Sequence, residues 1–198
     1  MFTGIIEGTG VVKKIIKETN GKRFVIDSGK LELNLKTGDS IAINGVCQTV
    51  ENASEKEFTV FSVPETLKLT NLNNLIEKDI INLERPLAAD GRFGGHIVQG
   101  HVENLCGVKD VEKHEGYWDI ILQYQSEYII PKGSVTLDGI SLTIHEILEN
   151  DRFRVQIIPE TVKRTNISHW ISGYDVNIET DYIVKAMDHI QNYRNKNR

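Results

Sequence analysis

Residues 38–50, with the sequence GDSIAINGVCQTV, recur without a gap as KGSVTLDGISLTI at residues 132–144, displaced by 94 positions. Two further segments return in the same order at a displacement of 95. PETLKLTNL at 64–72 returns as PETVKRTNI at 159–167, and INLE returns as VNIE. Ordered repetition at a nearly constant displacement indicates an internal duplication. The chain is therefore expected to contain two copies of one small domain.

Each copy contains short β-branched segments of alternating polarity, separated by Gly, Asn or Asp. Closely spaced strands with no long helix between them predict an antiparallel barrel rather than a parallel α/β sheet. The predicted strands are FVIDS, SIAIN, VCQTV, EFTVFSV and IINLE in the first copy, and WDIILQY, GSVTLDG, SLTIHEI, RFRVQII and DVNIE in the second. Short helical turns are expected at the two PET segments, where Pro precedes an acidic first turn.

The duplication predicts the domain organisation. We expect an N-terminal barrel at residues 1–88, a C-terminal barrel at 89–180 and a helix at 181–198, with residues 86–95 as the linker. In the last segment, apolar residues recur at helical spacing opposite a charged face. This stripe predicts either a subunit interface or packing against the chain's own barrel.

Charge and composition exclude several classes of protein. The formal net charge is −5, which disfavours binding to nucleic acid and gives no support to binding an anionic membrane. No apolar run approaches the roughly 20 residues that span a bilayer, and the N-terminus lacks a signal-peptide pattern. Cys47 and Cys106 show no metal-type spacing, so neither a disulfide nor a zinc site is expected. A cytoplasmic location fits these features.

Seven motifs, in order along the whole chain, resemble those of riboflavin synthases: MFTGI, NGVC.T, ETLKLTNL, NLER, GGHIVQGH, DGISLT and IPET. The resemblance implies an all-β fold of two tandem six-stranded antiparallel barrels. It also implies a C-terminal α-helix that forms a homotrimer, and an association with lumazine synthase is a further expectation.

The reaction that this resemblance implies is the dismutation of two 6,7-dimethyl-8-ribityllumazine molecules. Transfer of a four-carbon unit gives riboflavin and 5-amino-6-(D-ribitylamino)uracil, with no cofactor, because the substrate supplies its own electrophile and acidic methyl group. The family places the site between the N-terminal barrel of one subunit and the C-terminal barrel of its neighbour. Since one lumazine donates carbons and the other accepts them, differences between the copies are where catalysis is expected.

The first difference is Cys47, which aligns with Ser141. Residues two apart on a strand share a face, so Cys47 is expected beside Thr49 and Ser141 beside Thr143. The resemblance implies that Cys47, Ser141 and Thr143 are active-site residues. A lone Cys is otherwise most often a small buried residue. Whether Cys47 acts as a thiolate, a hydrogen-bond partner or a wall stays open.

The second difference is His101, which aligns with Ile5. An imidazole in only one barrel is suited to carry the proton of a methyl group, and the resemblance also implies a catalytic role for His101. His96 lies five residues earlier, on the opposite face of a regular strand, so no metal pair is expected. We assign His96 a structural role at the Gly94–Gly95 turn.

The remaining site residues rest on the resemblance. It implies catalytic roles for Asp138 and Lys132, although an Asp before Gly is equally a turn residue and a lone Lys is ordinarily a solvated charge. Residues implied to bind substrate are Ser40, Thr49, Thr66, Ile158 and Thr161. The two Thr residues of the PET segments could equally be capping residues.

Gln48 departs from the pattern, because it occupies a predicted buried position where the second copy has Leu142. A buried amide must find partners or cost about 1–3 kcal/mol, so hydrogen bonds to neighbouring groups or a subunit boundary are expected.

Two other functions compete with catalysis. Antenna proteins of the same fold bind lumazine or flavin without turnover, and other barrels bind oligonucleotides. The chain carries the catalytic-type residues Cys47, His101, Ser141 and Thr143, and it lacks basic strands with interleaved aromatic residues. Both observations favour an enzyme.

Overall fold

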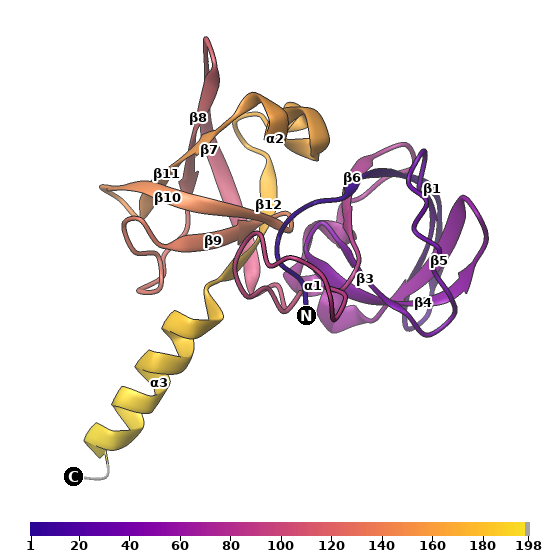
Figure 1. The fold of residues 1–198 in the computed structure, drawn as a ribbon, viewed down its shortest axis with the longest axis horizontal. Helices are drawn as coiled ribbons and strands as arrows, with labels where there is room; N and C mark the ends of the chain where they lie inside the picture. The colour runs from indigo at the N-terminus through magenta and orange to yellow at the C-terminus, as the bar shows by residue number, and fades with distance from the viewer. Residues whose placement is uncertain (197–198) are drawn as a thin grey trace.

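The computed structural model describes residues 1–196 as two closed six-stranded barrels followed by a helix (Figure 1). The first barrel comprises β1 (Gly8–Glu18), β2 (Gly21–Asp27), β3 (Ser40–Ile43), β4 (Val46–Ala53), β5 (Glu57–Ser62) and β6 (Ile80–Glu84). The second comprises β7 (Asn104–His114), β8 (Tyr117–Gln123), β9 (Ser134–Leu137), β10 (Ile140–Leu148), β11 (Arg152–Ile157) and β12 (Asp175–Thr180). The helical segments are α1 (Pro64–Leu69), η1 (Asn71–Asn73), α2 (Pro159–Arg164), η2 (Asn166–His169) and α3 (Tyr182–Lys196).

The two barrels have the same topology. The strand order is β1-β2-β5-β4-β3-β6 in the first barrel and β7-β8-β11-β10-β9-β12 in the second. Neighbouring strands pair antiparallel, so the predicted all-β fold with a C-terminal helix is confirmed. The last two residues of the predicted helix lie outside the described range. Within residues 1–196, no helix is long and apolar enough to cross a membrane.

The strands predicted from the sequence did not include β1 and β7, the first strand of each barrel, because each contains a β-bulge. Register shifts occur between Val12 and Lys14 in β1 and between Val108 and Asp110 in β7. A bulge inserts one residue and reverses the alternation of faces, so VVKKIIKE does not have the two-residue period of a strand.

Each barrel encloses its own apolar core, and the core of the first barrel also contains a polar pair, Gln48 and Ser62. Gln48 is 6% exposed; its Nε2 donates to the Cys47 carbonyl (2.7 Å), and Ser62 Oγ donates to its Oε1 (2.6 Å). The equivalent positions in the second barrel are the buried Leu142 and Ile157. Two polar residues thus replace two apolar ones together, and the predicted polar partner of Gln48 is confirmed.

The barrels meet at two equivalent hairpin turns. Asn44–Gly45 joins β3 to β4 and Asp138–Gly139 joins β9 to β10, all four residues having positive φ, as a type I′ turn requires. A Cβ atom on Gly45 would lie 2.6 Å from the Gly139 nitrogen. Glycine is therefore needed at both turns, because the hairpin tips touch.

Six buried polar side chains surround this contact: Asn44, Asn71, Asn82, Asp138, Asn166 and Asn177, here called the interbarrel network. Its bonds are exchanged symmetrically. The backbone N–H of Asn71 donates to Asn177 Oδ1, and the backbone N–H of Asn166 donates to Asn82 Oδ1, both at 2.7 Å. The side-chain amides of Asn82 and Asn177 in turn donate to the turn carbonyls of the opposite barrel, at 2.9 and 2.8 Å.

Asp138 is the one residue of the network whose equivalent in the other barrel, Asn44, is chemically different. The presence of Trp170 in the second copy explains this difference. Trp170 aligns with Leu75 and adds a donor, because its Nε1 donates to Asn166 Oδ1 (3.1 Å). Asp138 adds an acceptor: Oδ2 accepts from Asn166 Nδ2 (2.9 Å), and Oδ1 accepts from Asn71 Nδ2 and the Asn177 N–H (both 2.8 Å). Complete burial raises the pKa of Asp138 to about 7, although these hydrogen bonds act in the opposite direction.

Two loop segments cross between the barrels, joined by a bridge between Phe2 and Val98. The Ser141 N–H of the second barrel donates to the Gly4 carbonyl (2.8 Å), and the Cys47 N–H of the first donates to the Gly100 carbonyl (2.9 Å). A Cβ on either glycine would come within 2.7 Å of its partner's Cβ. Each segment thus lies against the barrel of the other copy.

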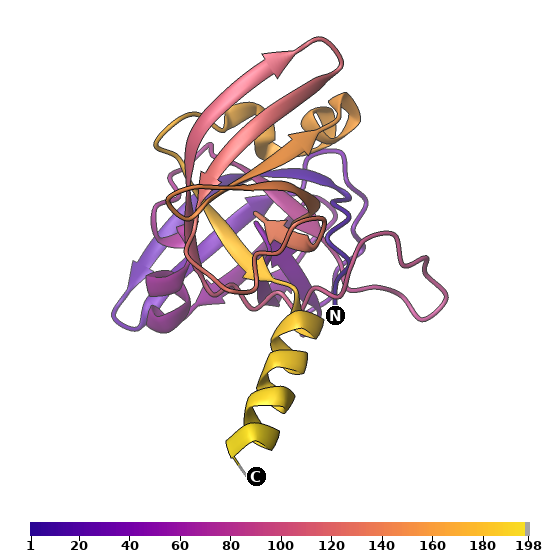
Figure 2. The same cartoon turned by 90° about the vertical axis from the view of Figure 1, so that its left-hand side faces the viewer.

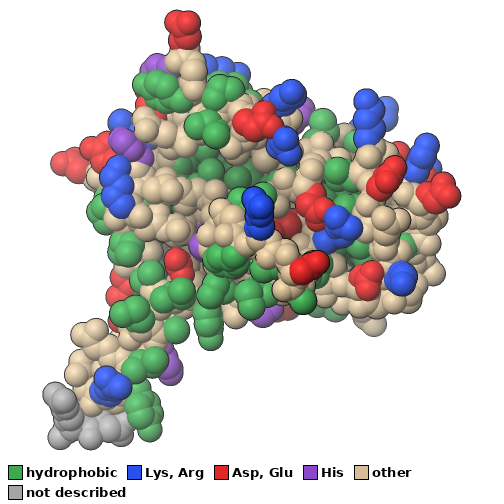
Figure 3. Space-filling model, viewed as in Figure 1, with side chains coloured by type: hydrophobic (Ala, Val, Ile, Leu, Met, Phe, Trp, Pro, Cys, Tyr) green, Lys and Arg blue, Asp and Glu red, His purple; other side chains and the backbone are tan. Residues whose placement is uncertain are grey.

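Helix α3 extends away from both barrels (Figures 1 and 2). Its base is held by an ion pair between Lys185 and Glu103. Ile183, Met187 and Ile190 are 49%, 67% and 52% exposed, and Figure 3 shows hydrophobic side chains along the helix. The apolar stripe therefore does not pack on the chain's own barrel.

The pairing of Asp138 with Trp170 predicts the effect of Asp138→Asn. Both carboxylate oxygens accept hydrogen bonds, so an amide at this position leaves one buried donor facing another, at a cost of about 1–3 kcal/mol. In a Trp170→Phe background the Asn166 oxygen keeps the hydrogen bond from Asn82 but loses the one from Trp170, so it can accept from the new amide and the cost should fall. Urea denaturation of the original chain, the two single variants and the double variant measures this cost in both backgrounds. Equal costs in the two backgrounds would contradict the explanation.

The same carboxyl predicts a pH dependence of stability. Between about pH 4 and 7, native Asp138 holds a proton that the unfolded residue, with a pKa of 3.8, has lost. The contribution of Asp138 to the free energy of unfolding therefore falls as pH rises through this window. Asp138→Asn should lack that contribution, so its destabilisation relative to the original chain should be larger near pH 4.5 than near pH 7.5.

Candidate active site

Cys47 and Ser141 lie at equivalent places on the outer faces of their barrels. Along β4 and β10, buried residues alternate with Cys47 and Thr49, and with Ser141 and Thr143, which are half-buried or exposed. The prediction that each pair shares a face is confirmed. Hydroxyl residues of the adjacent strand complete each face, since Thr49 lies opposite Ser40 and Thr143 opposite Ser134.

On the second barrel, a hollow of about 120 Å³ brings Ser141 and Thr161 together. Ile5, the counterpart of His101, lines it as well, together with Gly4, Ile6, Ile140, Glu160, Arg164 and Thr165. Ligand pockets usually measure about 300–1,000 Å³, so this hollow is smaller than a usual pocket.

On the first barrel, the structure places His101 beside Cys47. The Gly100 carbonyl accepts a hydrogen bond from the backbone N–H of Cys47. The backbone N–H of His101, the next residue, donates to Glu179 Oε2 (2.9 Å). His101 is exposed, and its backbone follows directly on the Gly100 carbonyl that contacts Cys47. Glu179 thus fixes the backbone that presents the imidazole.

The environment of Cys47 favours the thiol over the thiolate. Burial raises the pKa of Cys47, although a hydrogen bond with the Ser40 side chain acts in the opposite direction. Of the three roles left open from the sequence, the environment therefore supports a hydrogen-bond partner or a wall.

The sequence predicted a structural role for His96 at the Gly94–Gly95 turn, but the structure places its ring between two hydroxyl groups of the second barrel. His96 is 8% exposed, with Nδ1 2.7 Å from Ser141 Oγ and Nε2 3.0 Å from Thr136 Oγ1. Burial lowers the pKa of His96, although Asp181 acts in the opposite direction, so the ring is neutral near pH 7. A neutral imidazole has one N–H and one lone pair and can therefore orient the Ser141 hydroxyl.

One signal in the sequence could have indicated this contact. Thr136 lies opposite Ser141 in the β9–β10 ladder, where the first copy has Ala42 opposite Cys47. Two adjacent hydroxyls that appear in one copy only indicate a polar neighbour at this place.

Lys132 occupies a strained backbone position. Its φ is 63°, and its counterpart in the first copy is Gly38, with φ 92°. A left-handed conformation costs a residue with a Cβ about 1–2 kcal/mol. The exposed side chain places Nζ 3.5 Å from His145 Nδ1. A lysine kept where glycine fits better is a candidate for function.

The PET threonines do not cap their helices. The N-caps of α1 and α2 are Val63 and Ile158, without side-chain capping hydrogen bonds. Thr66 and Thr161 are half-buried, and Ile158 is 60% exposed. These residues are available to a ligand at the start of each helix.

Asp138 lies apart from the other candidates. Its side chain is fully buried in the interbarrel network, at a turn with φ 45°. These contacts support a role for Asp138 in the turn. The sequence favoured this role and a role in the active site equally.

Comparison with known proteins identifies the domains. The lumazine binding domain matches the chain twice, at residues 3–86 and 99–181. Riboflavin synthase of Bacillus subtilis is 40% identical over 201 residues, covering 100% of this chain and 93% of that protein. Riboflavin synthase of Actinobacillus pleuropneumoniae is 42% identical over 191 residues, covering 95% and 88%.

A solved structure, LumP complexed with 6,7-dimethyl-8-(1'-D-ribityl) lumazine, has the same fold, with a TM-score of 0.82. It is 24% identical in sequence, and the match covers 91% of this chain and 99% of that one. The two matched domains coincide with the two barrels, and the identity to riboflavin synthases extends over almost the whole chain. The chain therefore belongs to the riboflavin synthase family and is an enzyme of the transferase class.

Proposed function

We propose that the enzyme converts two 6,7-dimethyl-8-ribityllumazine molecules to riboflavin and 5-amino-6-(D-ribitylamino)uracil between the first barrel of one subunit and the second barrel of a neighbour. The observation that carries the proposal is the pair of equivalent outer faces at Cys47 and Ser141. Each face is equipped to hold one of two identical substrates. The hollow at Ser141 is too small to be a whole pocket, which supports completion by a second subunit.

The shared features of the two faces serve binding. Thr49 and Thr143, and the helix starts at Thr66 and Thr161, offer hydroxyl groups at matching places on both barrels. Holding both substrates in register makes a bimolecular encounter effectively unimolecular, which can lower the barrier by about 7–11 kcal/mol.

The unshared features serve the asymmetric chemistry. On the first face, His101 takes the proton from the substrate methyl group and returns it later, while the Cys47 thiol donates a hydrogen bond. On the second face, the imidazole of His96 orients the Ser141 hydroxyl, and Ile5 replaces His101. One face can thus move a proton where the other cannot. The products contain the same atoms as the two substrates, so this chemistry needs no oxidant.

The exposed stripe of α3 supports a homotrimer held together by this helix. Association with lumazine synthase and a cytoplasmic location remain predictions of the sequence.

The reaction itself is tested by incubating the enzyme with the lumazine in large excess and following flavin fluorescence. Many turnovers per chain are expected. A tightly bound chromophore without flavin formation would show an antenna-type binding protein instead.

His101→Ala should lower kcat by about 100-fold or more, because the proton carrier is lost. His96→Ala should lower it less, because His96 acts through Ser141. Both variants need native circular dichroism for the comparison to hold. A larger loss in His96→Ala would contradict the assignment of the two histidines.

Lys132→Gly should separate stability from activity. Relief of the left-handed backbone should stabilise the fold by about 1 kcal/mol, whereas turnover should fall if Lys132 has the catalytic role that the family resemblance implies. Urea denaturation and the fluorescence assay measure the two effects. Unchanged turnover would show that Lys132 is only a surface charge.

Charges on the α3 stripe should dissociate the oligomer. Met187→Lys with Ile190→Lys should give monomers with little activity, as should removal of residues 183–198. Asn192→Lys adds a charge on the opposite face of the helix and is the matched control. Sedimentation and activity should change together, and a fully active monomer would refute the intersubunit site.

A further inference from the structure

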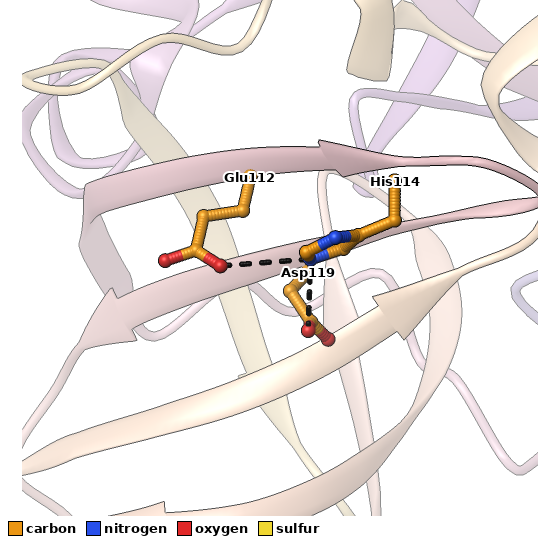
Figure 4. Close-up of side chains that lie close together, drawn as sticks. All are labelled: Glu112, His114 and Asp119. Atoms are coloured by element: carbon orange, nitrogen blue, oxygen red, sulfur yellow. Dashed lines mark ion pairs between the residues drawn. The ribbon is translucent and has the colours of Figure 1, made fainter.

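A cluster of three metal-ligating side chains lies outside the candidate active site, in the hairpin formed by β7 and β8. This hairpin projects beyond the second barrel (Figures 1 and 2). Glu112 and His114 come from β7 and Asp119 from β8, and Figure 4 shows the three side chains pointing toward one another. None of the three lines the hollow at Ser141.

Strand register brings the three residues together. Glu112 and His114 are two apart on β7 and share a face, and Asp119 lies directly opposite Glu112. Two carboxylates in directly opposite positions repel each other and destabilise a sheet. A cation between them would remove that cost.

The distances suit a shared ion. His114 Nε2 lies 3.5 Å from Glu112 Oε2 and 3.5 Å from Asp119 Oδ2, and the three ligand atoms fall within 4.8 Å of one another. Two atoms bound to a tetrahedral Zn²⁺ at about 2.1 Å are about 3.4 Å apart. Hydrogen bonds are shorter, at about 2.7–3.2 Å.

Asp119 supplies a second and independent observation. It is 9% exposed, and Oδ1, the carboxylate oxygen other than the one 3.5 Å from His114, is buried and has no hydrogen-bond partner within residues 1–196. A buried carboxylate oxygen without a partner carries a desolvation cost that a bound cation would offset.

The protein cations on the neighbouring strands have contacts outside the cluster. Arg154 on β11 lies diagonally across from Asp119, and its Nη1 lies 3.5 Å from Glu146 Oε2, whereas its buried Nε has no hydrogen-bond partner within residues 1–196. Lys113, the nearest lysine along β7, points to the other face, where its Nζ lies 4.2 Å from the centre of the Trp118 ring. Within the described residues, no Lys or Arg forms an ion pair with Glu112 or Asp119. The ring of His114 is fixed by stacking on Tyr117, with 4.7 Å between ring centres.

We infer that Glu112, His114 and Asp119 form a surface site for a divalent transition-metal ion of the zinc class. One imidazole and two carboxylates supply three ligands, and the fourth position is open to water or to a group from another molecule. The imidazole selects zinc-class ions over Mg²⁺ and Ca²⁺, which take oxygen ligands. The ion would brace the tip of the hairpin.

Calorimetric titration of the full chain with ZnCl₂ tests the site. We expect one ion per chain in the original protein and in His169→Ala, which removes an exposed histidine elsewhere. Affinity should fall at least about 10-fold in His114→Ala and in Asp119→Asn. Excess Mg²⁺ should not displace the zinc.

Three results would overturn the inference. They are absence of zinc binding, an equal loss of affinity in His169→Ala and His114→Ala, and displacement of the ion by Mg²⁺. The first would show that the three side chains contact only one another. Anomalous diffraction from zinc-soaked crystals gives a separate readout, with a peak expected among the three side chains.

Discussion

The relative placement of the two barrels depends on a polar contact rather than an apolar one. At the point where Gly45 touches Gly139, six buried polar side chains exchange hydrogen bonds between the barrels. An apolar interface tolerates sliding, but four donors of the interbarrel network have fixed acceptors in the other barrel, and a shift would leave these buried groups unpaired. Asp138 and Trp170 show how closely donors and acceptors are matched.

The crossing segments convert this symmetric contact into two unequal faces. Gly4 lies against Ser141 and Gly100 against Cys47, so each segment delivers its next residue to the other copy's barrel. Ile5 and His101 are those residues. One face therefore gains an imidazole and the other an aliphatic side chain, which is the asymmetry that the proposed reaction between two identical substrates requires.

Much of the fold could be predicted from the sequence, because strands and turns depend on local sequence patterns and both patterns occur in each of the two copies. β1 and β7 were missed because a bulge reverses the polarity pattern within each strand. The contact of His96 with Ser141 was missed because its segment is a loop, where strand alternation does not apply. The burial of Asp138 depends on Asn71 and Asn166, which lie far along the chain. Pairs of residues that change together between the copies, such as Gln48 with Ser62, would have predicted contacts of this kind.

The central claim is that one catalytic site takes its two faces from different subunits, and complementation tests it most directly. His101→Ala damages the first face and Ser141→Ala the second, so each variant alone should be nearly inactive. Unfolding the two together and refolding them as mixed oligomers should restore flavin formation, because some sites then combine two intact faces. If both faces came from one chain, every site would contain a damaged face, and the mixture would be no more active than its parts.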